Sequence, residues 1–192
     1  MGQADAFGIK SVVTGRDLSL RNYNMNIRKP NRAKDHDYSD DGYYFVTICT
    51  KNRKKYFGEI KNGKMILNKS GLIVKKQWEW LKKYKYIYLD ILKIMPNHLH
   101  GILIIDSENV GTGRDLSLQK EKVKSLSELI GAFKTASSKL IHLHSDFNFQ
   151  WQRSFYDRII RNENELIKIR EYIINNPLKW DLDENNLENI FI

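Results

Sequence analysis

Two histidines, His98 and His100, are separated by one residue within an apolar run from Ile91 to Asp106. Side chains alternate across a strand, so this spacing places both imidazoles on one face of an extended segment. Both could then bind one divalent cation, and the pattern is compatible with a metal site. The alternative from spacing alone is a pair of hydrogen-bonded core histidines.

A tyrosine and an asparagine near the end of the chain could complete such a site, because catalytic metals need further ligands and an open position. Tyr172 and Asn176 are four residues apart, which places the phenol and the carboxamide on one helix face. A tyrosine aimed at a cation-bound phosphate can act as a nucleophile, since the cation offsets charge on the phosphoryl oxygens. Tyr156 is the rival nucleophile, but its place beside Phe155 on a strand favours packing or base stacking.

The spacing of the histidine pair recurs at His142 and His144. These residues fall at the end of a predicted helix, where side chains two apart point ~200° from each other. Joint binding of one metal ion is therefore not expected there.

Basic side chains are concentrated between residues 51 and 85. The whole chain of 192 residues carries a net charge of +9, and this segment has twelve Lys and Arg against Glu59 and Glu79. Lys51, Arg53, Lys54 and Lys55 open it, and aromatic residues are interleaved with the lysines. Such a pattern indicates a polyphosphate partner such as nucleic acid. The alternative is a solvated, lysine-rich helix face.

Length and composition favour one domain plus a tail. The sequence lacks an apolar stretch long enough to span a bilayer and a secretory signal pattern, so no membrane partner is expected. Cys49 is the single cysteine and cannot form an internal disulfide. A cytoplasmic location fits these features.

The elements that must position these residues start near Gly42, after a polar stretch interpreted as a mobile leader. We expect a strand over 43–50, then a hairpin over 54–67 whose turn is Asn62-Gly63. A helix capped by Asn68 or Ser70 should follow to about residue 84. Its apolar positions are Leu72, Ile73, Trp80 and Leu81.

Strands and helices also follow one another in the second half of the chain. Strands are predicted over 86–95 and 98–106, joined at Pro96-Asn97, and this pair would carry the histidines at its rim. A helix starting after Ser125 or Ser127 runs to residue 143, and a last strand lies within 149–161. Asn162 caps a final helix over 163–175 that Pro177 stops. This order predicts an α+β, ferredoxin-like antiparallel sheet with helices packed on one face and an additional C-terminal helix.

The heptapeptide Thr-Gly-Arg-Asp-Leu-Ser-Leu occurs twice, at 14–20 and 112–118. Both copies lie in polar, turn-rich segments, so this is not a solenoid repeat. We hypothesise that a short dispersed DNA repeat was copied into the gene twice; free divergence at synonymous codons would contradict this.

Three separated motifs follow one another along the chain: Met95-Pro96-Asn97-His98-Leu99-His100-Gly101, Trp151-Gln152-Arg153-Ser154-Phe155-Tyr156-Asp157, and Arg161-Asn162-Glu163 through Glu171-Tyr172-Ile173-Ile174-Asn175-Asn176-Pro177. In this order they resemble the REP-associated tyrosine transposases, members of the single-tyrosine HUH transposase group. The resemblance spans about residues 42 to 180. It implies an RRM-like catalytic domain over 42–180, between a leader of residues 1–41 and a tail of residues 181–192.

The resemblance also implies an activity. Such enzymes bind hairpin-forming single-stranded DNA and cut it by tyrosine attack, leaving a 5′-phosphotyrosine and a free 3′-OH. Mg or Mn is held by the two histidines and a third polar residue. By position, the ligands are His98, His100 and Asn176, and the nucleophile is Tyr172. The cell compartment implied is the nucleoid, and both a monomer and a homodimer fit.

Further DNA contacts are expected from the second motif and the residues after it. Arg153, Arg158 and Arg161 could contact phosphates, and Trp151 could stack on a base. The alternatives are surface arginines and a core tryptophan.

Two other functions stay open at the level of sequence. One is a DNA hairpin-binding protein without catalysis, and the weaker one is an endonuclease related to replication initiators or relaxases. A loss of Mn²⁺ binding in a His98→Ala, His100→Ala variant would favour the enzyme.

Overall fold

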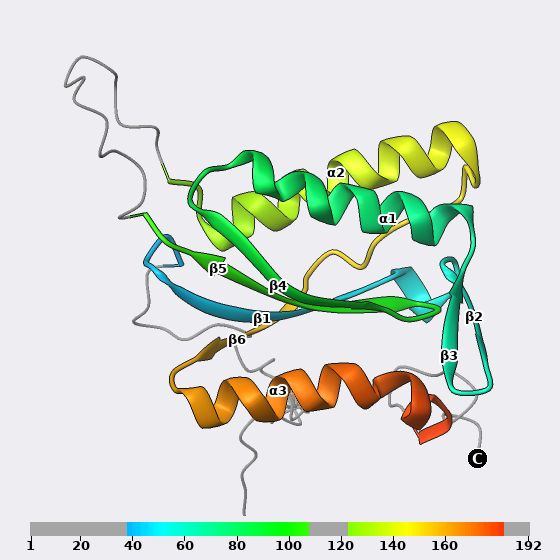
Figure 1. The fold of residues 1–192 in the computed structure, drawn as a ribbon. Coiled ribbons are helices and arrows are strands. Elements are labelled where there is room, and N and C mark those ends of the chain that lie inside the picture. The colour runs from blue at the N-terminus through cyan, green and yellow to red at the C-terminus, as the bar shows by residue number, and fades with distance from the viewer. Residues whose placement is uncertain (1–37, 108–122, 183–192) are drawn as a thin grey trace, which may run out of the picture.

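Four antiparallel strands form the central sheet of the computed structural model, which describes residues 38–107 and 123–182. The strands are β1 (Gly42–Cys49), β4 (Ile87–Ile94), β5 (His98–Ile105) and β6 (Tyr156–Ile160), in the order β4-β5-β1-β6 (Figure 1). Strands β5 and β1 are therefore inner strands, and β4 and β6 are the edges. With its helices, this order is the predicted ferredoxin-like arrangement, which is confirmed.

A small hairpin leaves the sheet between β1 and the first helix. It consists of β2 (Gly58–Lys61) and β3 (Lys64–Leu67), and the 3-10 turn η1 (Lys51–Arg53) precedes it. Asn62 and Gly63 have φ angles of 51° and 68°, as a tight turn of this kind requires. The hairpin predicted from this dipeptide is confirmed.

Helices α1 (Lys69–Glu79) and α2 (Leu126–His144) pack together on one face of the sheet (Figure 1). Asn68 caps α1 by accepting a hydrogen bond from the backbone N–H of Gly71. Ser125 caps α2 in a capping box with Glu128. Of the two caps proposed for each helix, Asn68 and Ser125 are the ones used; the 3-10 turn η2 (Trp80–Lys83) extends α1.

The apolar stripe expected on α1 was partly wrong. Leu72 and Trp80 are exposed, whereas Val74 and Trp78 are buried against the sheet. The reason is Gly71, where a Cβ would lie 2.3 Å from the Phe57 carbonyl oxygen. This close approach of the backbone sets the helix rotation, and positions three and seven residues later then face the core.

The opposite face of the sheet carries α3 (Glu163–Asn175), alone among the described α-helices (Figure 1). Leu166 and Ile173 are buried in a second cluster with Phe45, Ile102 and Ile160 of the sheet. Asn162 caps the helix by accepting from the N–H of Glu165, as expected. Beyond Asn175 the chain continues as a 3-10 helix, η3 (Asn176–Leu182), so Pro177 ends the α-helix but not the helical course.

Two ion pairs fix α3 across the sheet. Arg170 Nε lies 2.8 Å from Asp90 Oδ2 on β4, and Arg158 of β6 lies 2.6 Å from Glu165. Each pair is partly exposed and contributes little stability by itself. Because β4 and β6 are the two edge strands, the pairs define how the helix crosses the sheet.

Several sequence expectations fall outside the described residues. These are the leader up to residue 37, both copies of the repeated heptapeptide, and the tail beyond residue 182. Among the described helices, none has the length and apolarity needed to cross a bilayer.

Gly101 offers a test of the packing between sheet and α1. A Cβ here would lie 2.5 Å from Cζ2 of Trp78. We expect Gly101→Ala to lower the free energy of unfolding by about 1–3 kcal/mol, because the ring is fully enclosed and must shift. Denaturant unfolding followed by tryptophan fluorescence measures this.

The matched control is Gly131→Ala on α2, where a Cβ meets nothing within 4 Å. A helix-interior alanine should leave stability unchanged or raise it by up to ~1 kcal/mol. Equal effects of the two substitutions would contradict the packing described.

Candidate active site

The two histidines lie at the beginning of β5, on the face of the sheet that α3 covers. Leu99 and Leu103 belong to the core on the α1 side, whereas Ile102 packs with α3. Alternation therefore turns both His98 and His100 toward α3. Their side chains are 0 % and 2 % exposed, and the two Nε2 atoms are 3.0 Å apart.

Each imidazole has a partner on its other nitrogen. Asn97 donates a hydrogen bond from Nδ2 to the Arg53 carbonyl, which identifies Oδ1 as the acceptor end of its side chain. This Oδ1 lies 2.8 Å from His98 Nδ1 and accepts the N–H of that ring. His98 Nε2 therefore carries a lone pair. His100 Nδ1 is 2.8 Å from the hydroxyl of Thr47, which can accept as well as donate. Ligand histidines are usually oriented by such contacts, and the sequence alone did not single out Asn97 or Thr47 for this role.

Burial keeps His98 neutral. Removal from water, and to a smaller extent the charge of Arg53, together lower its pKa from 6.5 to about 3. A neutral imidazole is the form that binds a metal ion. The side chain is thus ready to act as a ligand well below neutral pH.

The geometry of the pair fits a divalent cation. When two nitrogen atoms each lie about 2.1 Å from one ion and their bonds to it form a right angle, the nitrogens are about 3.0 Å apart. This is the separation of the two Nε2 atoms. Within residues 38–107 and 123–182, His, Cys, Asp and Glu form no cluster of three that could hold a metal, so any third protein ligand there is of another type.

Tyr172 reaches the pair from α3. Its hydroxyl oxygen is 3.4 Å from His100 Nε2, and its ring is 48 % exposed, so the phenol borders both the histidine and solvent. Phe45 of β1 contacts the rings of His100, Tyr172 and Tyr156, at centroid distances of 5.6, 6.2 and 6.3 Å. Tyr156 lies two strands from His100, because both pair with Thr47. Of the two tyrosines considered from sequence, Tyr172 is the one whose hydroxyl approaches His100.

Asn176 lies one turn beyond Tyr172 and is 4 % exposed. Its Oδ1 is buried without a hydrogen-bond partner. One turn further, Trp180 stacks on His98 at a centroid distance of 6.0 Å. Asn176 thus sits between two residues that contact the histidines. Trp180 was not expected here, since the predicted helix stopped at Pro177.

Four of the predicted DNA-binding residues gather beside His98. They line one pocket at the end of β1 and are Lys51, Arg53, Trp151 and Arg153. Lys54 follows η1 and is exposed, and Lys55 Nζ lies 6.0 Å from the ring centroid of Trp180. The basic residues of 51–55 therefore surround the histidine end of the sheet.

Trp151 is half-buried: it packs against the main core and also lines the pocket at the end of β1. Its ring packs against Phe57, Phe133 and Phe149, and its Nε1 donates to the Ser137 hydroxyl at 3.0 Å. Of the two roles that the sequence left open for Trp151, these contacts favour packing.

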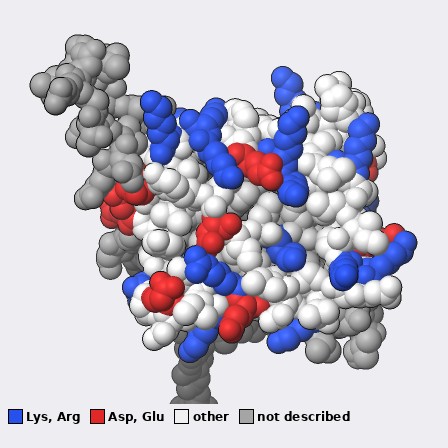
Figure 2. Space-filling model, viewed as in Figure 1, with Lys and Arg blue, Asp and Glu red and all other residues white. Residues whose placement is uncertain are grey.

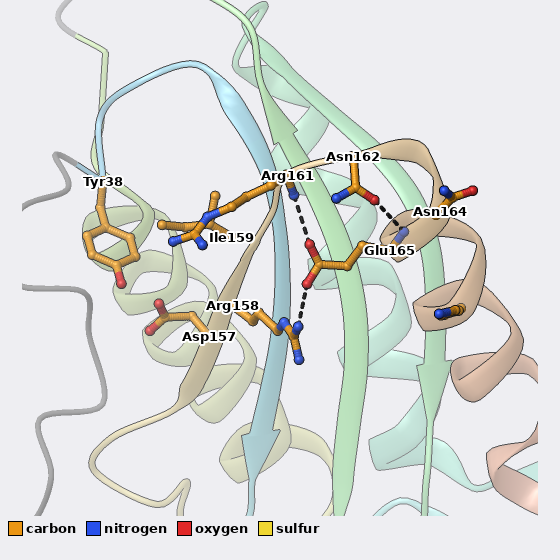
Figure 3. A pocket seen from close by; sticks show the side chains of 9 residues that line it. Tyr38, Asp157, Arg158, Ile159, Arg161, Asn162, Asn164 and Glu165 are labelled. Atoms are coloured by element: carbon orange, nitrogen blue, oxygen red, sulfur yellow. Dashed lines mark hydrogen bonds and ion pairs between the residues drawn. The ribbon is translucent and has the colours of Figure 1, made fainter.

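Arg158 and Arg161 lie elsewhere on this face (Figure 3). They line a pocket of about 570 Å³ at the start of α3, where Glu165 accepts from the backbone N–H of Arg161 and pairs with Arg158. Tyr156 lies at the level of His100 in the sheet, because both pair with Thr47. Arg161 is five residues beyond Tyr156, which corresponds to roughly 16 Å along an extended strand. The seven predicted arginine and lysine contacts therefore divide into two groups, one at the histidine end of the sheet and one at the start of α3.

Five of the other lysines of the basic segment lie in the helical layer on the opposite face of the sheet. Lys69, Lys75, Lys76, Lys82 and Lys83 are exposed on α1 and η2, and Figure 2 shows basic side chains over this layer. The sheet separates them from the histidines. His142 and His144 are also on this layer, where His142 Nε2 contacts the Phe149 carbonyl and His144 is exposed.

Comparison with known proteins establishes a family and a fold. No family model matches the chain. An uncharacterized protein of Haemophilus influenzae is 37 % identical over 172 residues, covering 84 % of this chain and 96 % of that protein. The chain belongs to the same family as this Haemophilus influenzae protein.

Among solved structures, a REP-associated tyrosine transposase bound to a REP hairpin is similar with a TM-score of 0.52. The similarity covers 79 % of this chain and 74 % of that chain, at 18 % sequence identity. The two proteins therefore share their fold.

The lowered pKa of His98 makes stability depend on pH. The folded pKa lies below the ordinary value, so its stabilising effect is complete above about pH 6.5 and is lost as the pH falls toward 3. Between about pH 6 and 4, the free energy of unfolding of the wild type should fall by up to ~1.4 kcal/mol per pH unit more than that of His98→Gln. Parallel pH profiles from denaturant unfolding would contradict a buried neutral histidine.

Proposed function

We propose that this protein nicks and rejoins single-stranded DNA, with Tyr172 as the nucleophile, as a transposase of the tyrosine type. The observation that carries the proposal is the 3.4 Å approach of the Tyr172 hydroxyl to His100, within a buried histidine pair. The shared fold with a tyrosine transposase supports it.

The reaction is a phosphoryl transfer to the phenol. The Tyr172 oxygen forms a bond to phosphorus, the bond from phosphorus to the 3′ oxygen breaks, and that oxygen leaves as a hydroxyl after gaining a proton. The phenol loses one proton, so atoms and charge balance. The phosphodiester energy is kept in the phosphotyrosine, and a 3′-OH can reverse the step without ATP.

His98, His100 and Asn176 are the proposed ligands of a Mg²⁺ or Mn²⁺ ion. The buried, unpartnered Oδ1 of Asn176 supports this, because such an oxygen usually has a partner and is a donor that these cations accept. When bound, the ion offsets the charge on the phosphoryl oxygens. A nitrogen that binds a cation cannot also take a proton, so His100 positions the site and is not the base for Tyr172.

The protein environment performs the remaining tasks. Asn97 and Thr47 hold the imidazoles in orientation, and Phe45 supports the ring of Tyr172 at its edge. Lys51, Arg53 and Arg153 lie where they could bind phosphates of a strand that enters past His98. The transposase that shares this fold is bound to a REP hairpin, and we propose hairpin-forming DNA as the substrate here as well.

Replacing the nucleophile tests the reaction directly. Tyr172→Phe should abolish the covalent adduct with a nicked suicide hairpin oligonucleotide and leave DNA affinity within about twofold, since only one hydroxyl is removed. The adduct is measured by denaturing gel electrophoresis with manganese present.

Tyr156→Phe is the matched control, because Tyr156 is exposed to a similar extent and also contacts Phe45. It should form the adduct at the wild-type level. An adduct retained by Tyr172→Phe and lost by Tyr156→Phe would transfer the role to Tyr156; adduct formation by both would refute a single tyrosine nucleophile.

Removing the partner of His98 tests the metal site. Asn97→Ala should weaken Mn²⁺ binding by about 10–100-fold, because the imidazole loses the group that fixes its tautomer and orientation. Calorimetric titration measures the affinity, and circular dichroism reports folding. Asn164→Ala, an exposed asparagine on α3, is the control and should bind as the wild type does.

A wild-type protein that binds hairpin DNA but no Mn²⁺ would contradict the proposed catalysis. That result would instead favour a hairpin-binding protein without a working site.

A further inference from the structure

A pocket of about 430 Å³ lies at the end of β1, between η1 and the loop before β6. Its charged and amide-bearing lining residues are three cations and three carboxamides, with no carboxylate among them. They are Lys51, Arg53, Arg153, Asn52, Gln150 and Gln152. The cations suit phosphate groups, whereas the carboxamides suit the edges of bases.

This pocket adjoins the histidine pair. Cys49, the last residue of β1, pairs with His98, and the Thr50 N–H donates to the Asn97 carbonyl at 2.9 Å. Asn97 also binds the Arg53 carbonyl through its side chain. One residue thus connects the pocket wall to the orientation of His98.

The backbone around the pocket is held in place from several sides. The Lys51 N–H donates to the Gln150 carbonyl at 2.8 Å, and the Gln152 N–H donates to the Cys49 carbonyl at 2.9 Å. Lys134 of α2 donates to the carbonyls of Gln152, Arg153 and Ser154, at 2.9 to 3.3 Å. The loop that carries both glutamines is therefore fixed before any ligand binds.

Asn52 and Arg53 also adopt a conformation that costs energy. Their φ angles are 54° and 51°, in the left-handed region that side chains other than glycine rarely occupy. Two such residues in succession are typical of a segment that is held for a functional reason. The strain presents both side chains to the same pocket.

The orientation of one carboxamide is set as well. Lys51 Nζ donates to Gln150 Oε1 at 2.7 Å, which leaves the amide nitrogen as the donor end of that side chain. The acceptors on a purine, N7 of both bases and O6 of guanine, match such a donor. Asn and Gln pair best with adenine, so the three carboxamides of the lining favour a purine.

We infer that this pocket binds one unpaired purine nucleotide of the DNA strand, next to the phosphate that the histidine site processes. Gln150, Gln152 and Asn52 read the base, and Lys51, Arg53 and Arg153 hold the flanking phosphates. The inference rests on the proposed function and adds to it a determinant of sequence preference.

The experiment uses a DNA hairpin with a fixed stem and four randomised nucleotides on each side. The pool is bound to the full-length protein, and bound molecules are sequenced. The wild type should enrich purines at least about fivefold at one flanking position. A Gln150→Leu, Gln152→Leu variant should lose this enrichment and keep its affinity for the pool within about threefold, because the phosphate contacts are intact. Gln77→Leu on α1 is the control and should retain the preference.

A second variant gives a result that misfolding cannot produce. Gln152→Glu replaces a donor by an acceptor, and glutamate accepts from the cytosine amino group. The preferred base should shift from purine toward cytosine at the same position.

The outcomes separate the two proposals. Covalent adduct formation by the wild type without any base preference, or a preference unchanged in both glutamine variants, overturns the pocket and leaves the proposed function intact. Absence of the adduct with wild-type protein on every hairpin in the pool overturns the proposed function, and with it the role of the pocket in that reaction.

Discussion

Two imidazoles held 3.0 Å apart in a buried position are the constraint around which this structure is organised. Their nitrogens are oriented and shielded from bulk water by different parts of the chain. The turn before β5 supplies Asn97, the neighbouring strand supplies Thr47, and η3 supplies the ring of Trp180. Such polar pairs are costly to bury unless every partner is present.

The ferredoxin-like sheet meets this constraint by separating two tasks between its faces. Helices α1 and α2 cover one face with a large apolar core, which includes Trp78 and Phe133. The other face carries a smaller core beneath α3, and the histidines lie beside it. The main core and the proposed chemistry thus lie on opposite sides of the same strands, so that residues at the candidate site are less constrained by the packing of the main core.

Local signals in the sequence were sufficient for most of the fold. The Asn62-Gly63 turn, the caps at Ser125 and Asn162, and the alternation in β1 and β5 each act over a few residues, so they can be identified without a structure. The rotation of α1 was wrong because Gly71 contributes a close backbone contact that no count of large apolar residues detects. For the site, the sequence brought His98, His100 and Tyr172 to attention, and the structure places them together. The sequence could not identify Thr47 or Trp180 as neighbours of the histidines. The contact of Thr47 follows from the strand register, and that of Trp180 follows from the course of the chain after Pro177.

The ion pairs at the two sheet edges have a consequence for how this chain can vary. Arg170, which pairs with Asp90 of β4, comes only two residues before Tyr172. Glu165, which pairs with Arg158 of β6, lies more than one helical turn before Arg170. Each residue added to or removed from an α-helix rotates everything after it by about 100°. An insertion between Arg170 and Tyr172 would therefore turn the phenol, Asn176 and Trp180 away from the histidines together, although no residue of the site had changed. Changes of residue type on the outer side of α3 can accumulate, whereas the number of residues between its anchor and its tyrosine is fixed.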